Sequence, residues 1–183
     1  PNPRIKNEEK LAFVNSPTQE ILSHVRSRFI VLSLAVALLL NLLPLQDVAL
    51  LLRPDFVALM VLYWSINQPQ RVGMSVAFAM GLLMDVGDAS IFGQHALAYS
   101  VMAFIALLLH RRLRIFSLRK QVPQVGLLLL SAQLVMLLTG LLAGANLPGW
   151  DFFLASASGA LLWPLLPALL KMPQRRKPDP DAL

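Results

Sequence analysis

Long apolar runs, separated by short polar or proline-containing segments, fill most of the chain between residues 29 and 170. A helix needs about 20 apolar residues to cross about 30 Å of hydrocarbon, and fewer where neighbouring helices shield its ends. We therefore predict an all-α membrane protein, a bundle of six transmembrane helices, with five as the main alternative count. The predicted spans are residues 29–45, 56–66, 72–84, 91–109, 125–145 and 152–170.

Charged residues divide between the two ends of these predicted helices. With a cytoplasmic N-terminus, the cytoplasmic segments would hold every Lys and Arg except Arg53, which is 15 of the 16. That split satisfies the positive-inside rule at every loop in a single register. We therefore expect a multi-pass protein with both termini in the cytoplasm. The outer segments would hold Asp47, Asp55, Asp85, Asp88 and Asp151.

The same pattern predicts three regions. Residues 1–28 form a polar cytoplasmic segment, residues 29–170 the transmembrane domain, and residues 171–183 a cytoplasmic tail. The first apolar run ends without a small-residue cleavage pattern, so we expect it to remain as a span rather than to act as a cleaved signal. The tail is rich in proline and charge, and we expect it to be disordered.

Prolines near the apolar runs predict local features. Pro54 is expected in the first turn of the second helix, which would put Asp55 near the positive end of that helix. Pro164 and Pro167 are expected to kink the last span without ending it.

Composition narrows the possible chemistry. The chain is 56% hydrophobic and only 14% charged, which is too apolar for the surface of a soluble domain of this size. It has no cysteine, so disulfides, thiolate metal ligands and cysteine nucleophiles are excluded. With few histidines, we expect neither a metal site nor a cofactor.

One predicted cytoplasmic loop is strongly basic. Its cations are Arg111, Arg112, Arg114, Arg119 and Lys120. Such a cluster orients the helices and attracts anionic headgroups, and docking of a cytoplasmic partner is the alternative. Recognition of nucleic acid needs aromatic or base-reading groups on the basic face, and this loop offers only Phe116. We therefore expect no nucleic-acid partner.

Small residues recur at helical spacing in three of the predicted helices. Helices in lipid associate through close backbone approach, which small residues allow. We favour packing within the chain, with contact to another protein as the alternative. The predicted packing positions are Gly73, Ala77, Gly81, Gly140, Gly144 and Gly159.

Polar residues gather near the outer ends of the second, third and fourth predicted helices. A polar group within hydrocarbon is costly and needs a partner. We expect Arg53 to form an ion pair with Asp85 or Asp55, and His95 to hydrogen-bond to either carboxylate. A structural cluster that joins the helices is the favoured interpretation, and a ligand cavity, a proton path or acid/base catalysis is the alternative. The candidate cluster is Arg53, Asp55, Asp85, Gln94 and His95.

Four segments of the chain resemble the MreD family of rod shape-determining proteins. They are RPDFVALMVLYW at residues 53–64, PQRVG at 69–73, GLLMD at 81–85 and GQHALAYS at 93–100. The resemblance covers roughly residues 28–170. It implies a non-enzymatic scaffold of the bacterial inner membrane that binds MreC. It also implies an assembly with the MreB filament, the glycosyltransferase RodA and a class B penicillin-binding transpeptidase, which controls peptidoglycan synthesis and rod cell shape.

The resemblance further implies a fold similar to the six-helix substrate-binding component of energy-coupling-factor vitamin transporters. By that analogy the polar cluster would line or brace an outward-facing cavity. Two other functions are open: a small-molecule uptake component, and a membrane enzyme acting on a lipid-linked substrate. The first would show a tightly bound ligand, and the second a turnover that Asp85→Asn abolishes.

Overall fold

The computed structural model describes residues 27–43, 53–89 and 91–171, and all regular structure within them is helical. This confirms the all-α class predicted from the apolar runs. The predicted segment 1–28 and tail 171–183 lie almost entirely outside the described residues. The helices are α2 (Ser27–Asn41), α4 (Phe56–Asn67), α5 (Met74–Gly87), α6 (Gln94–Ile115), α7 (Leu118–Leu142), the 3-10 helix η1 (Trp150–Phe153), α8 (Leu154–Leu162) and α9 (Leu165–Lys171).

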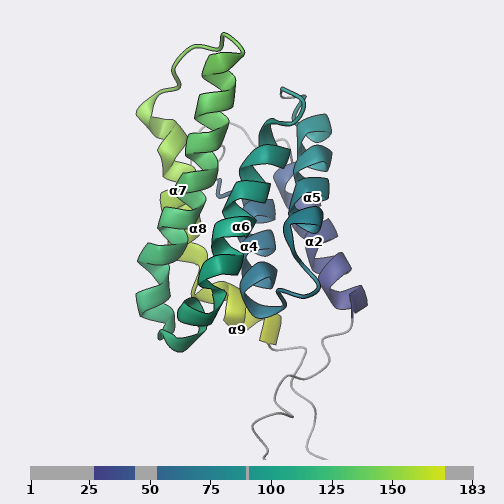
Figure 1. Cartoon of the computed structure of the whole chain (residues 1–183), viewed down its shortest axis with the longest axis vertical. Helices are drawn as coiled ribbons and strands as arrows, with labels where there is room; N and C mark the ends of the chain where they lie inside the picture. The colour runs from purple at the N-terminus through teal and green to yellow at the C-terminus, as the bar shows by residue number, and fades with distance from the viewer. Residues whose placement is uncertain (1–26, 44–52, 90, 172–183) are drawn as a thin grey trace, which may run out of the picture.

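The helices form a bundle around α6, and the described connections from α4 onward alternate between its two ends (Figure 1). α6 packs against α4, α5 and α7, while α2 packs against α4 and α8 against α7. At the lower end of Figure 1 lie the start of α2, the α6–α7 turn and α9. At the upper end lie the α5–α6 and α7–η1 connections. Polar residues from four different helices are thereby brought together at the upper end.

Aromatic residues form the centre of the core. Trp64 of α4 and Trp163, which follows α8, are each 1% exposed. The Tyr63 ring lies 5.1 Å from the Trp64 ring and 6.0 Å from the Trp163 ring, centroid to centroid. The Trp64 indole N–H donates to the Ser33 hydroxyl of α2 at 2.9 Å, so its polar atom is satisfied inside the core. These contacts join the first and last described parts of the bundle.

The outside of the bundle is apolar and the inside holds polar groups. Leu32 of α2 is 62% exposed, Val86 of α5 70% and Leu138 of α7 59%. Asn41 and Asp85, by contrast, are each only 2% exposed. A soluble protein shows the opposite preference, whereas a bundle in lipid turns its apolar side chains outward and pairs its polar groups within.

Two of the described helices, α6 and α7, are long and apolar enough to cross a membrane. α2, α4, α5 and the segment Trp150–Leu162 are shorter apolar helices. The short length of α4 and α5 agrees with the short second and third runs of the sequence.

Two predicted boundaries in the basic region are wrong. α6 continues to Ile115, and α7 begins at Leu118, so the expected loop is reduced to a turn at Phe116 and Ser117. Arginine and leucine are good helix formers, and cations are favourable at a helix C-terminus, so the basic stretch extends α6. The basic residues therefore lie on helices: Arg111, Arg112 and Arg114 end α6, and Arg119 and Lys120 begin α7.

The prolines act differently from the prediction. Pro54 lies outside α4, and Asp55 is the N-cap of that helix. The last predicted span is divided into α8 and α9 at Trp163 and Pro164. Proline lacks the N–H that a continuing helix needs, so Pro164 ends α8, while Pro167 lies within α9.

Candidate functional site

Asp55 joins three helices at the upper end of the bundle. Its carboxylate caps α4 by accepting from the Ala58 backbone N–H at 2.9 Å. It also accepts from the Asn41 amide of α2 at 2.9 Å and from the Tyr99 hydroxyl of α6 at 2.6 Å. The prediction that Asp55 lies at the positive end of its helix is confirmed.

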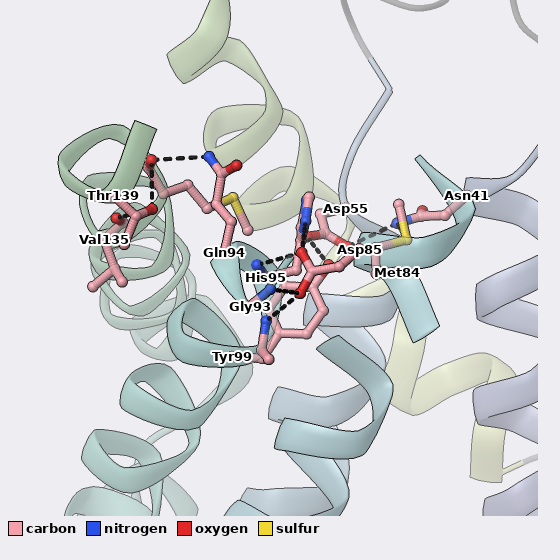
Figure 2. Close-up of polar contacts among 12 residues, drawn as sticks. Asn41, Asp55, Met84, Asp85, Gly93, Gln94, His95, Tyr99, Val135 and Thr139 are labelled. Atoms are coloured by element: carbon pink, nitrogen blue, oxygen red, sulfur yellow. Dashed lines mark hydrogen bonds and ion pairs between the residues drawn. The ribbon is translucent and has the colours of Figure 1, made fainter. Parts of the chain in front are cut away.

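Asn41 completes this junction. Its Oδ1 accepts from the Phe56 backbone N–H at 2.9 Å while its Nδ2 donates to Asp55, so the two side chains share the exposed amides at the start of α4. Its Nδ2 also lies 3.7 Å from the Met84 sulfur of α5 (Figure 2). One amide side chain therefore touches α2, α4 and α5 together.

Asp85 caps α6 from a neighbouring helix. Its Oδ2 accepts from the backbone N–H of Gly93 at 2.9 Å and of Ala96 at 3.3 Å. Its Oδ1 accepts from the backbone N–H of His95 at 2.8 Å. α6 has no side-chain cap of its own, since Gly93 stands at its N-cap, with a φ of 94° that favours glycine. A carboxylate of α5 thus satisfies the free amides at the start of α6.

The His95 side chain binds the same carboxylate. Its Nδ1 lies 2.9 Å from Asp85 Oδ1 (Figure 2). Because an ionised carboxylate only accepts, this contact places the imidazole proton on Nδ1. The His95 ring also packs edge-on against Tyr99, with centroids 5.8 Å apart. The expected hydrogen bond between His95 and a carboxylate is therefore present, with Asp85 as the partner.

Arg53 does not pair as predicted. Its guanidinium donates from Nη1 to the Leu43 backbone carbonyl at 3.0 Å, and neither Asp55 nor Asp85 forms an ion pair with it. Both carboxylates already accept hydrogen bonds from N–H or O–H donors of α2, α4 and α6. The Arg53 cation therefore lies at the edge of the polar cluster. The predicted ion pair is wrong because backbone amides, which a residue pattern does not reveal, bind the carboxylates first.

A cavity of about 240 Å³ opens beside these caps. Arg53, Asp55, Asp88 and His95 line it together with residues of α7 and α8. Asp88 follows the end of α5, and partial desolvation raises the pKa of its carboxyl, although the nearby His95 and Arg53 act in the opposite direction. Asp85 does not line this cavity, and its carboxylate binds the amides at the start of α6.

Gln94 points away from the cluster. Its Nε2 donates to the Met136 backbone carbonyl of α7 at 2.9 Å (Figure 2). The Thr139 hydroxyl donates to the same carbonyl at 2.9 Å. Gln94 therefore ties α6 to α7 rather than lining the cavity, and it is the one predicted cluster residue that the structure sets apart from the others.

Sequence reasoning missed several polar members of the site. Asn41 and Tyr99 bind Asp55, and Gln133 and Ser156 line the far wall of the cavity and hydrogen-bond to each other. Gln133 also donates to the Phe152 backbone carbonyl at 2.7 Å. A detectable signal existed for Gln133, because an amide in the middle of the longest apolar run must find a partner inside the bundle.

Two of the predicted small-residue positions make close contacts within the chain. A Cβ on Gly81 of α5 would lie 2.4 Å from the Ala96 Cα of α6. A Cβ on Gly159 of α8 would lie 2.8 Å from the Leu129 side chain of α7. Ala77, one turn before Gly81, is fully buried. At Gly81 the two helix backbones approach too closely for a larger residue, whereas at Gly159 the contact is with the end of a leucine side chain.

The predicted packing positions Gly73, Gly140 and Gly144 do not all make such close contacts. Gly73 is the N-cap of α5, and a Cβ there would meet nothing closer than 3.9 Å. Gly140 is buried in α7, but Gly144 lies beyond the end of that helix with a φ of 86°. Gly144 therefore belongs to the turn, and the expected pairing of Gly140 with Gly144 on one helix face is wrong.

The two central carboxylates of the cluster hold helices together. Asp55 and Asp85 each accept several hydrogen bonds from helix starts or neighbouring side chains. Within the described ranges, no group of three or more His, Cys, Asp or Glu side chains is placed to hold a metal ion.

Comparison with known proteins gives a consistent result. Residues 24–173 match the sequence model of a family described as rod shape-determining protein MreD. A protein of Haemophilus influenzae named rod shape-determining protein MreD is 29% identical over 141 residues, which cover 77% of this chain and 87% of the relative. No solved structure matches the chain.

Proposed function

Because the chain belongs to the MreD family of rod shape-determining proteins, we propose that it is a non-enzymatic inner-membrane scaffold that binds MreC in the cell-elongation complex. A role in rod shape determination follows from the family. In the proposed complex, the MreB filament, RodA and a class B penicillin-binding transpeptidase are the further partners, and the scaffold helps control peptidoglycan synthesis.

The observation that carries the non-enzymatic role is the use of the two central carboxylates. Asp55 caps α4 and Asp85 caps α6 from α5, so both acidic groups hold helix starts in place. Catalytic sites normally present convergent ionisable groups to a substrate. Here the groups converge on the protein backbone, which favours a rigid scaffold.

The proposed topology has six crossings, with α8 and α9 together forming the last. The described connections alternate between the two ends of the bundle (Figure 1). The α6–α7 turn at the lower end is flanked by the basic residues, and the upper end carries Asp55, Asp85 and Asp88. The positive-inside rule then puts the lower end, and both chain termini, in the cytoplasm.

An exposed apolar groove is the best surface for a partner's span. Gly81 and Gly159 make contacts within the chain, so neither is available to a partner's span. A cavity of about 530 Å³ between α2, α4 and α9 is instead lined only by apolar side chains. Its wall includes Val36 of α2, which is 47% exposed, and Leu169 of α9, which is 67% exposed. The proposed occupant is the single MreC span.

Cysteine cross-linking tests this proposal, because the chain has no natural cysteine to give background. Val36→Cys and Leu169→Cys would be expressed with MreC variants that carry single cysteines along its span. We expect cross-links from both positions. Phe78→Cys, on the outer face of α5 and 49% exposed, is the matched control and should give none.

The expected phenotype is loss of rod shape. In a strain depleted of the wild-type protein, Val36→Trp and Leu169→Trp should fill the groove. The cells should then become round, and MreC should be lost from a pull-down. The control variant Phe78→Trp should restore rod shape in the same strain. Cross-links from Phe78→Cys alone would move the contact to α5. Normal MreC recovery with every variant would contradict the groove.

The small-molecule uptake role has one supporting observation, the polar cavity beside Asp55 and His95. Pockets for ligands of vitamin size usually measure about 300–1,000 Å³. The cavity, at about 240 Å³, falls below that range. A stoichiometric small molecule in the purified protein, detected by mass spectrometry, would favour uptake over the scaffold.

A further inference from the structure

A second amphipathic cavity lies between α6 and α7 near the lower end of the bundle. Its volume is about 390 Å³, and it shares no lining residue with the polar cavity at the upper end. The lining positions on each helix follow helical spacing, so they form two facing stripes. On α6 they are Ile105, Leu109, Arg112 and Leu113, and on α7 they are Gln124, Leu127, Leu128 and Ser131.

The cavity changes from polar to apolar along its length. Arg112 lies near the end of α6, where Phe116 also lines the cavity. Ile105, seven residues earlier, lies about 10 Å further along the helix axis. Leu109 and Leu127, which are 38% and 68% exposed, border the apolar part. A ligand that fits must be charged or polar at one end and a hydrocarbon at the other.

Two polar groups at this cavity have no partner among the residues that the structure describes. The Gln124 Oε1 is buried and accepts no hydrogen bond. The Arg112 guanidinium forms no hydrogen bond or ion pair with any described residue, unlike Arg114, which donates to the Ile66 carbonyl at 2.7 Å. A buried acceptor without a donor is costly, so the Gln124 oxygen calls for a hydroxyl or amine donor. The Arg112 guanidinium is exposed at the cavity and can bind an anion.

The surrounding charge selects an anionic ligand. Between residues 89 and 150 the chain contains no Asp or Glu. Arg111 is next to Arg112 on α6, and Arg119 and Lys120 are in the first turn of α7. Basic pockets between transmembrane helices on the cytoplasmic side are known sites for anionic lipid headgroups.

We propose that this α6–α7 cavity is a specific binding site for one anionic phospholipid of the inner leaflet. The lipid phosphate binds the Arg112 guanidinium, and a headgroup hydroxyl donates to Gln124 Oε1. One acyl chain lies along Ile105, Leu109, Leu127 and Leu128. The site goes beyond the scaffold role and does not depend on MreC.

Native mass spectrometry of the full-length protein tests the site. The purified protein in mild detergent is titrated with phosphatidylglycerol, and separately with phosphatidylcholine, and the apparent Kd of the first bound lipid is measured. We expect phosphatidylglycerol to bind tighter. Arg112→Gln should weaken it by about ten-fold, as expected for loss of a charge-assisted hydrogen bond, and Gln124→Leu should weaken it less.

Arg111→Gln is the matched control, because it removes the same charge from the neighbouring position that does not line the cavity. Its affinity for phosphatidylglycerol should stay within about two-fold of the wild type, because Arg111 does not line the cavity and would not contact the bound phosphate. Equal losses of phosphatidylglycerol affinity in Arg111→Gln and Arg112→Gln would show that the lipid is attracted by the basic surface as a whole, and would overturn the proposal. Displacement of the lipid by millimolar inorganic phosphate would also overturn it.

Discussion

At the scale of single residues, the decisive feature is a buried carboxylate that serves a helix other than its own. Asp85 belongs to α5 but accepts from three backbone amides at the start of α6 and from the His95 ring. Asp88, three residues later, is exposed beyond the end of α5. The two aspartates thus have similar positions in the sequence and opposite structural roles.

We expect Asp85→Ala to destabilise the protein much more than Asp88→Ala. The first change leaves three buried or partly buried amides without their acceptor, at up to about 1–3 kcal/mol for each unsatisfied group, whereas the second removes an exposed charge. The measurement is the thermal midpoint and the monodisperse yield of each variant in detergent. Asp85→Asn keeps one acceptor oxygen and should fall between them. Equal midpoints for the two alanine variants would contradict the buried cap.

The site could be predicted from the sequence only in part. Polar residues beside apolar runs pointed to Asp55, Asp85 and His95, because charge in hydrocarbon needs partners. Their partners could not be found in this way, since they are mainly backbone amides whose positions depend on how α5 meets α6. The same limitation produced the wrong pairing of Arg53.

At the scale of the elements, α5 and α6 approach each other closely at Gly81. Gly81 faces the backbone of Ala96, and α6 begins only two residues before that contact. The Asp85 cap lies one turn further along α5. Close packing and the cap therefore reinforce each other at the same corner, and each requires the other to be correctly placed.

We expect Gly81→Ala to disrupt this corner and Gly73→Ala to be tolerated. A Cβ at position 81 would meet backbone atoms at 2.4–2.6 Å, which cannot move without separating the helices, whereas at position 73 the nearest atom is 3.9 Å away. An overpacked site typically costs about 1–3 kcal/mol. Thermal midpoints in detergent compare the two variants. A stable Gly81→Ala protein would show that the two helices can separate without loss.

The elements themselves could be predicted better than their ends. Each apolar run contains a helix or a pair of short helices, because the pattern of apolar residues directly shows the length of each hydrophobic segment. The end of α6 and the start of α7 were misplaced because the predicted spans included only the apolar run and left out the charged residues beside it. Arginines continue a helix well, and Arg114 is held by the carbonyl of Ile66 at the end of α4.

At the scale of the whole molecule, the two ends of the bundle differ in charge. The basic residues of α6 and α7 flank the lower turn, and the aspartates of α4 and α5 lie at the upper end. Ser117 in the lower turn and Asn146 in the upper loop are both exposed. These two positions report the orientation of the bundle in the membrane.

We expect Ser117→Cys and Asn146→Cys to react on opposite sides of the membrane. A membrane-impermeant maleimide should label position 146 in cells whose outer membrane alone is permeable, and position 117 only after lysis. The physical reason is retention of the cations at the cytoplasmic leaflet. The cysteine-free parent chain is the control for background. Labelling of position 117 before lysis would reverse the proposed topology.

The cap that α5 provides to α6 also bears on how the chain is made. Asp85 precedes its amide partners by only eight to eleven residues, so the acceptor is synthesised shortly before the donors that need it. As α6 leaves the translocon, its exposed amides meet a carboxylate already delivered by the preceding helix. The two helices therefore suit insertion as a hairpin, a pair that enters the bilayer with its polar corner already closed.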